Sequence, residues 1–291
     1  FSNSGAEANE CAIKTARRRA YQTYGDESHS TIITLQSSFH GRTITTLSAT
    51  GQDCFHTEFG PFTGGFVHAR PGDIEDLYRL AESYDCCAVM LDTIQGEGGI
   101  NVLDREYVRA AWELCQKRDM LLIVDEVQTG NGRTGKLYSY MHYDITPDIV
   151  TTAKGLAGGL PMGATLFGSR CADVLTPGSH GSTFGGNPVA AAGAVSIIER
   201  IDDTLLEAVI QKEQLVRAAL ADAPGVIGVS GRGLMLGIQC EKKAGDIMSR
   251  AAEEGVLVLT AKDKVRLLPA LNIPDDLLME AMEILKRVIA E

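Results

Sequence analysis

Short runs of apolar, mostly β-branched residues recur through the first half of the chain. They are TIITL (31–35), AVML (88–91), LLIV (121–124) and IVTTA (149–153). Amphipathic stretches, such as residues 74–83 and 107–118, lie between them. Strands that alternate with helices predict an α/β fold with a mostly parallel, doubly wound sheet. Runs that are apolar throughout suit a sheet that is covered on both faces.

The pattern changes from about residue 187 onward. Two helical stretches, 187–201 and 205–221, precede short strand-like and helical runs that end in a helix from residue 275. This order predicts a smaller α+β domain that is joined through a long helix. We therefore expect a large domain over residues 1–194 and a small C-terminal domain over residues 195–291.

Composition excludes several classes of function. The formal net charge of −11 disfavours a nucleic-acid-binding surface, and no run of about 18 apolar residues predicts a membrane span. The seven cysteines are scattered, without paired C-x-x-C spacing, so we expect reduced, mostly buried thiols and a cytoplasmic protein. The opening FSNSGAEANE has no signal-peptide pattern and resembles a segment from the middle of a protein chain. We therefore expect that an N-terminal segment is missing.

Polar and reactive side chains follow each of the four strand-like runs. The first run leads to Phe39, His40 and Arg42, and the second leads to Asp92 and then QGEGG (95–99). The third and fourth runs lead to the residues Asp125, Glu126, Gln128 and Lys154. Because ligands bind beyond the carboxyl ends of strands in an open parallel sheet, we expect these side chains to share one rim.

The loop GNGRTGK (130–136) matches the dinucleotide pattern G-x-G-x-x-G and most of the P-loop pattern. A phosphate there would meet the negative charge of Asp125 and Glu126 at the strand end. The P-loop also requires Ser or Thr after Lys136, where this chain has Leu137. We therefore interpret the nucleotide match as chance, although a nucleotide-binding enzyme stays a rival hypothesis, as does a non-catalytic binding protein.

A better phosphate site is predicted at the beginning of the chain. Ser4, Gly5 and Ala6 precede an amphipathic helix, with Ser4 as its N-cap, Glu7 completing a capping box, and Arg17–Arg19 suiting its C-terminal end. Free N–H groups at a helix start bind phosphate well, although an ordinary capped helix would show the same pattern.

A phosphate site, a strand-end lysine, a strand-end aspartate and an aromatic ring together indicate pyridoxal 5′-phosphate (PLP). The lysine amine can form a Schiff base with the cofactor's aldehyde. The aspartate can keep the pyridine nitrogen protonated, which makes the ring an electron sink, and the aromatic face can stack on that ring.

These segments carry a family resemblance. SNSGAEANECAIKTAR, FHGRT, QGEGG, DEVQTGNGRTGKLY, AKGLAGGLPMGA, HGSTFGGNP and VRLLPALNI resemble the class III (ornithine-type) aminotransferases in order and spacing, over essentially the whole chain. The resemblance implies the fold of the type I PLP-dependent transferases. Within the family the chain is most similar to the acetylornithine group. It implies transfer of an amino group from N-acetylornithine, or a similar ω-amino donor, to 2-oxoglutarate.

The resemblance also implies roles for particular residues around the cofactor. Lys154 would form the Schiff base, Asp125 would bind the pyridine nitrogen, and Gln128 would bind the ring's 3′-oxygen. Phe39 and Val127 would cover the two ring faces. The phosphate would be bound by Ser4, Gly5 and Ala6, together with Ser182 and Thr183 from the neighbouring subunit of a homodimer. No metal is expected.

For the substrates, the resemblance implies that Arg266 binds the α-carboxylate and that Arg42 binds a distal carboxylate or acetamido group. Glu97 would pair with Arg266 and tune it between amino donor and 2-oxoglutarate. Both arginines could instead form structural ion pairs, and QGEGG could be a simple tight turn. Asp125 could cap a helix or pair with Arg133, and His40 is expected to pack or to bond backbone. An ornithine or 4-aminobutyrate aminotransferase, or an inactive truncated relative, stays open.

Overall fold

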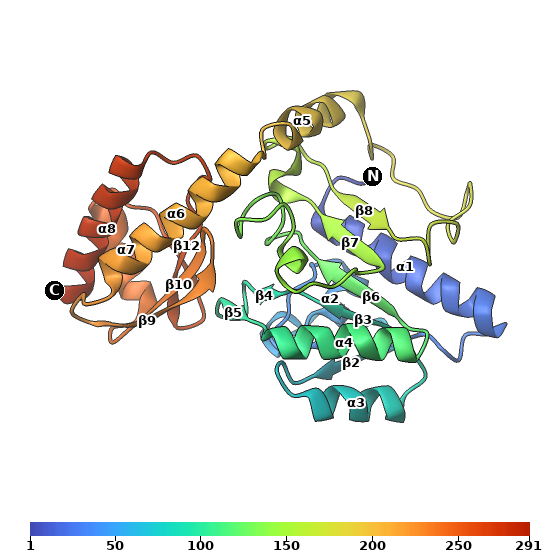
Figure 1. The fold of residues 1–291 in the computed structure, drawn as a ribbon. Helices are drawn as coiled ribbons and strands as arrows, with labels where there is room; N and C mark the ends of the chain where they lie inside the picture. Colours follow the sequence, from blue (N-terminus) through green and yellow to red (C-terminus); the bar gives the residue numbers. More distant parts are fainter.

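The protein forms two bodies, each built around its own β-sheet (Figure 1). The computed structural model describes residues 1–291. A larger body carries the N-terminus, and helices α5 (Pro188–Ile198) and α6 (Asp203–Leu220) lead from it to a smaller body that ends at the C-terminus.

The elements have the following bounds. The remaining helices are α1 (Gly5–Tyr24), α2 (Ile44–Ala49), α3 (Ile74–Ser83), α4 (Arg105–Lys117), α7 (Ala244–Glu253) and α8 (Asp275–Ala290). The strands are β1 (Thr31–Leu35), β2 (Phe66–Ala69), β3 (Cys86–Leu91), β4 (Ile94–Gln95), β5 (Asn101–Val102), β6 (Leu121–Asp125), β7 (Ile149–Thr152), β8 (Ala164–Phe167), β9 (Val226–Arg232), β10 (Met235–Cys240), β11 (Leu259–Ala261) and β12 (Lys264–Leu267). Short 3₁₀ turns are η1 (Asp53–Phe55), η2 (Ser139–His142) and η3 (Lys154–Ala157).

The larger sheet is mixed and mostly parallel, as predicted. Its six strands run in the order β2-β1-β3-β6-β7-β8, and only β8 is antiparallel to its neighbour. The chain leaves β1 for β2 on one side and then returns to place β3 on the other side. Such a change of direction opens a crevice beyond the carboxyl ends of the strands.

Both faces of this sheet are covered, because alternate strand residues point to opposite sides. Ile33, Val89 and Leu122 belong to one core with side chains of α3 and α4, whereas Ile32, Ala88 and Ile123 belong to another core with α1. Figure 1 shows α3 and α4 together on one face and α1 on the other. The all-apolar strand runs in the sequence follow from this burial on both sides.

The smaller sheet is antiparallel, with the strand order β11-β12-β10-β9. Its core is formed with side chains of α6, α7 and α8. All of its strands follow residue 195, where the small domain was expected to begin, although that point lies within α5. The α/β large body and the α+β small body are the fold class predicted from the sequence.

Some elements differ from the sequence prediction. β2 (FVHA) and the antiparallel β8 were not predicted, because each is a strand of only four residues in which at least one position is not fully buried. β11 begins at Leu259, so most of the predicted strand VLVL (256–259) lies outside it. α1 continues to Tyr24, so Arg17–Arg19 lie before its last turn and not at its C-terminal end as expected.

The burial of the cysteines and the character of the helices agree with the sequence predictions. Six of the seven cysteines are buried and only Cys54 is exposed, as predicted for mostly buried thiols. None of the helices combines the length and the apolar character that crossing a membrane requires.

The glycine-rich loop between β6 and β7 wraps around the carboxylate of Glu126. That carboxylate accepts hydrogen bonds from the Thr129 hydroxyl, at 2.5 Å, and from the backbone N–H of Tyr140, at 2.7 Å. Burial, opposed by these hydrogen bonds, raises the pKa of Glu126 to about 7. The loop contains the 3₁₀ turn η2 but no α-helix, which a dinucleotide site would require after its glycines.

The same loop connects the two bodies. The Arg133 guanidinium donates to the carbonyl oxygens of Leu234 and Pro269 in the small body, at 3.1 and 2.5 Å. Gly135 adopts φ +81°, and a Cβ there would lie 2.5 Å from Cγ1 of Ile210 on α6. Gly135 of GNGRTG therefore allows a close approach between the loop and α6, and Arg133 does not pair with Asp125.

Replacing Gly135 by alanine tests this close approach. A matched control is Gly25→Ala, because Gly25 adopts a similar φ of +85° but has no atom within 4 Å of the added Cβ. We expect Gly25→Ala to lower the free energy of unfolding in urea by about 1 kcal/mol, which is the cost of a left-handed residue. Gly135→Ala should cost at least about 2 kcal/mol, since overpacking adds to that strain. Equal losses would contradict the packing argument.

Candidate active site

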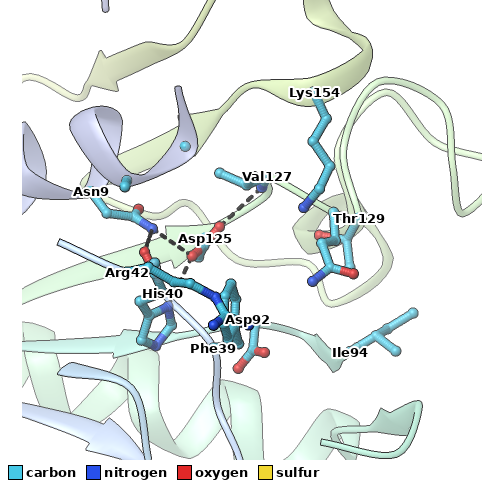
Figure 2. A pocket seen from close by; sticks show the side chains of 14 residues that line it. Asn9, Phe39, His40, Arg42, Asp92, Ile94, Asp125, Val127, Thr129 and Lys154 are labelled. Atoms are coloured by element: carbon cyan, nitrogen blue, oxygen red, sulfur yellow. Dashed lines mark hydrogen bonds and ion pairs between the residues drawn. The ribbon is translucent and has the colours of Figure 1, made fainter. Parts of the chain in front are cut away.

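A cavity of about 340 Å³ lies at the carboxyl ends of the central strands (Figure 2). The exits of β1, β3, β6 and β7 all contribute to it, as the sequence predicted. It is lined by Gly5, Ala6, Asn9, Phe39, His40, Gly41, Arg42, Asp92, Ile94, Asp125, Val127, Gln128, Thr129 and Lys154. Its volume is within the usual range for small-molecule sites.

Asp125, the last residue of β6, is held by three donors. Its Oδ2 accepts hydrogen bonds from the Asn9 amide and from Nδ1 of His40, both at 2.8 Å, and its Oδ1 accepts one from the Val127 N–H at 3.0 Å. The residue is only 4% exposed and forms no ion pair with Lys or Arg. No α-helix begins directly after β6, so Asp125 caps no helix. It presents a fixed carboxylate to the cavity (Figure 2).

Lys154 follows β7 and reaches into the space that Asp125 faces (Figure 2). Its backbone adopts a φ of +48°, an uncommon value for a residue with a side chain, at the first position of η3. Burial lowers the pKa of its amine, with a further contribution from Arg266, while the carboxylates of Asp125 and Glu97 oppose the shift. A lysine with a lowered pKa is a better nucleophile and base near neutral pH.

The N-terminus of α1 forms another wall. Ser4 is its N-cap, as predicted, and its hydroxyl accepts a hydrogen bond from the Glu7 N–H at 3.2 Å. The Glu7 carboxylate accepts from the N–H of Asn3, one residue before the expected capping-box partner. The N–H groups of Gly5 and Ala6 donate to no acceptor within the chain, so they are free to bind an anion.

Close packing brings this helix start to the cavity. A Cβ on Gly5 would lie 2.6 Å from Cγ1 of Val127, and a Cβ on Gly41 would lie 2.9 Å from that of Ala6. Larger residues at either glycine would push α1 away from the strand exits. The free N–H groups are therefore positioned by two close contacts.

Phe39 and Arg42 form the aromatic side of the cavity. Phe39 packs edge-on against Phe55 with ring centroids 5.6 Å apart. The Arg42 guanidinium lies 4.7 Å from the Phe55 centroid and 5.8 Å from that of Phe39, and it pairs with no carboxylate. Arg42 is thus free for an anion, and the alternative of a structural ion pair does not hold for it.

Glu97 and Arg266 meet beside the cavity without lining it. Nη1 of Arg266 lies 2.8 Å from the Glu97 carboxylate, and Nε of Arg266 is buried without a partner. A Cβ on Gly96 would lie 2.4 Å from Oε1 of Gln128, so the turn QGEGG packs closely against a residue that lines the cavity. The pair also connects the two bodies, because Arg266 belongs to β12.

The arrangement fits a phosphorylated pyridine aldehyde. It offers an amine for the aldehyde, a buried carboxylate for a protonated ring nitrogen, an aromatic face, and unpaired N–H groups at a helix start for a phosphate. Few other ligands would use all four features together.

Comparisons with known proteins agree with this chemistry. The family model described as "Aminotransferase class-III" matches residues 1–289. The chain belongs to the class III aminotransferases. Members of this family depend on PLP. Both the family resemblance and the fold class predicted from the sequence are thereby confirmed.

Individual relatives of this aminotransferase cover nearly all of the chain. It is 48% identical to the acetylornithine aminotransferase of Haemophilus ducreyi, over 100% of this chain and 74% of that protein. The structure of the Stenotrophomonas maltophilia N-acetylornithine aminotransferase superimposes with a TM-score of 0.85 and 36% identity, covering 99% of this chain and 73% of the other. The Toxoplasma gondii ornithine aminotransferase, described with partial PLP occupancy at its active site, gives 0.91 and 33%, with 99% and 71% covered.

Of the residues expected at the phosphate, Gly5 and Ala6 line the cavity of this chain, whereas Ser4, Ser182 and Thr183 do not. Ser182 accepts a hydrogen bond from the Asn3 side chain at 2.9 Å, and Thr183 is exposed. Their expected role was toward a neighbouring subunit's cofactor, which a single chain does not test.

Sequence reasoning missed three residues of the aminotransferase site. His40 was expected to pack or to bond backbone, but its ring binds the Asp125 carboxylate. Asn9 was seen only as part of a helix, and Asp92 only as a strand-end acid. A signal for His40 was available, because it directly follows Phe39 in FHGRT, but no local pattern shows which carboxylate a histidine will meet.

Proposed function

We propose that this aminotransferase uses PLP to transfer an amino group from N-acetylornithine to 2-oxoglutarate, giving glutamate. The observation that carries the proposal is the shared cavity of Lys154 and Asp125, with the free N–H groups of Gly5 and Ala6 at its wall. The choice of N-acetylornithine is supported by relatives that bear the name acetylornithine aminotransferase at 44–48% identity over the full chain.

We assign the residues around the cofactor from the walls of the cavity and from the adjoining N-cap, Ser4. Lys154 would bind the aldehyde carbon, Asp125 would accept a hydrogen bond from the protonated ring nitrogen, and Gln128 would bond the 3′-oxygen. Phe39 and Val127 would enclose the ring, and Ser4, Gly5 and Ala6 would bind the phosphate. When bound, the cofactor supplies an electron sink that stabilises negative charge at the substrate's reacting carbon.

Lys154 would have a second role as general base. Its amine, once free of the aldehyde, would take the proton from the substrate's reacting carbon and return one at the cofactor's C4′. Burial lowers the pKa of this amine, which raises the fraction of free base at neutral pH. Asp125, held by Asn9 and His40, would stay in place while the proton moves.

Carboxylates of the substrates would be bound by the two arginines. Arg42 lies at the cavity without an acidic partner, so it suits a distal carboxylate or acetamido group. Arg266 would bind an α-carboxylate only after Glu97 releases it, since the two are in direct contact. This competition would let one site accept both an amino donor and a dicarboxylate.

We also propose that the chain divides into its two domains between residues 194 and 195. In addition, we propose a homodimer in which each subunit contributes residues to the other's active site. Around the segment that carries Ser182 and Thr183, large apolar side chains are exposed: Phe184 by 71%, Val189 by 68% and Val195 by 56%. Several large apolar side chains exposed within one short segment favour association with another protein surface. Ser182 and Thr183 would then reach the phosphate of the partner's cofactor.

Initial rates with different amino donors test the substrate assignment. We expect kcat/KM with 2-oxoglutarate to be at least about tenfold higher for N-acetylornithine than for ornithine or 4-aminobutyrate, a difference of ~1.4 kcal/mol in transition-state binding. The measurement is glutamate formation by the holoenzyme at matched donor concentrations. A faster reaction with ornithine would replace the proposal with an ornithine aminotransferase.

Glu97→Gln tests the competition for Arg266. The variant removes the negative charge that occupies the guanidinium, so glutarate, an inert dicarboxylate, should bind several-fold more tightly. Dissociation constants can be measured by calorimetry on the PLP-loaded protein. Glu113→Gln is the matched control, because Glu113 forms only an exposed pair with Arg109 on α4. Equal glutarate affinity in the two variants would contradict the assignment of Arg266 to the substrate site.

A further inference from the structure

A buried cluster of His40 and Asp92, to which the proposed reaction assigns no chemical step, adjoins Asp125. His40 lies against it with a side chain that is 0% exposed, and Asp92, the residue after β3, is 7% exposed. Nδ1 of His40 is bonded to Asp125, but its Nε2 has no hydrogen-bond partner. Oδ1 of Asp92 is also buried without a partner. Figure 2 shows His40 and Asp92 at the same end of the cavity.

The negative charge of this cluster needs a compensating positive charge. Neither Asp92 nor Asp125 pairs with a lysine or arginine, so two neighbouring buried carboxyl groups lack a permanent cation. Burying an uncompensated carboxylate is costly, and like charges so close together raise that cost. A protonated imidazole that is bonded to Asp125 can supply the missing positive charge.

We propose that His40 is a positioning residue for Asp125, and that it acts as an imidazolium bonded to the Asp125 carboxylate, with the carboxyl group of Asp92 nearby. The inference rests on the proposed PLP chemistry, because Asp125 is the group that meets the ring nitrogen. The cation fixes Oδ2 of Asp125 together with Asn9, and it keeps this carboxylate ionised in a site from which water is largely excluded. Asp92 in turn keeps His40 charged.

The backbone around His40 is built to hold the ring in place. The His40 N–H donates to the Thr50 hydroxyl at 3.0 Å, and its carbonyl accepts from the Asn9 amide at 2.7 Å. Asn9 is itself oriented by the Thr151 hydroxyl, at 2.6 Å. The same Asn9 amide therefore serves both His40 and Asp125. The imidazole has little freedom to turn away from the carboxylate.

Proton affinities in the cluster agree with this geometry. Burial disfavours a charged His40, but the hydrogen bond and charge of Asp125 and the charge of Asp92 outweigh it and raise the pKa of the ring. Burial raises the pKa of Asp92 to about 7, with His40 opposing the shift and Asp125 adding to it. His68 on β2 also responds to His40, since burial and the nearby His56 and His40 lower its pKa. Lys154 faces Asp125 from the other side of the cavity.

Histidine ring titration of the protein tests the charge state without relying on activity. We expect the ¹⁵N signals of His40 to titrate with a midpoint above ~6.5, the ordinary value for histidine. Asp92→Asn keeps the size of the side chain but removes its charge, and should lower that midpoint. A His40 midpoint below the ordinary value, or one that Asp92→Asn leaves unchanged, would overturn the proposal.

Cofactor affinity tests the positioning role. His40→Asn keeps a neutral donor near the position of Nδ1 but cannot carry a positive charge. We therefore expect the dissociation constant of PLP, followed by the visible absorption of the cofactor, to rise about tenfold, or ~1.4 kcal/mol. His40→Leu should weaken binding further. The control is His68→Asn, which removes another partly buried histidine, bonded to Thr34 and not to Asp125, and should change the affinity less than twofold.

The outcomes separate the two proposals. Equal PLP affinity of His40→Asn and His68→Asn would contradict a role for His40. Failure of the unmodified protein to bind PLP would instead refute the proposed function, while the titration of His40 would still decide its charge.

Discussion

The fixed carboxylate of Asp125 is the interaction on which the site depends. A buried anion at the end of a central strand is stable only when donors surround it, and the chain supplies them from three segments, two of which are distant from Asp125 in sequence. Asn9 comes from α1, His40 from the segment after β1, and the Val127 N–H from the loop after β6. Satisfying this one group therefore brings the helix start and the first strand exit to the place where Lys154 arrives.

The parallel sheet makes that meeting possible. Its strands end at a common edge, and the change of direction between β1 and β3 leaves room there. The glycine-rich loop then returns the chain around Glu126, and Arg133 ties the loop to the small body. Arg266 on β12 is thereby brought to Glu97. The motif that looked like a nucleotide site is a structural connector that holds both bodies around the cavity.

Much of this was predictable from the sequence, for physical reasons. Strand runs buried on both faces are apolar throughout, so the central strands β1, β3, β6 and β7 were found, and their polar exits identified Asp125 and Lys154. The N-cap at Ser4 is a local signal and was also found. The short strands β2 and β8 were not, because their burial depends on neighbours that no local pattern describes.

Long-range polar contacts were also not predicted from the sequence. Nothing in FHGRT shows that His40 would meet Asp125, and nothing near Asn9 shows that its amide would bridge the two residues. Such contacts join residues 85 and 116 positions apart. The roles proposed for Ser182 and Thr183 would depend on a second copy of the chain.

The most direct measurement is borohydride reduction of the PLP-loaded protein, followed by peptide mapping of the modified lysine. If Lys154 and Asp125 bind opposite ends of one pyridine ring, reduction fixes the cofactor on Lys154, and Asp125→Ala weakens its binding before reduction. A cofactor adduct on any other lysine, or none on a protein that has bound PLP, would contradict the account.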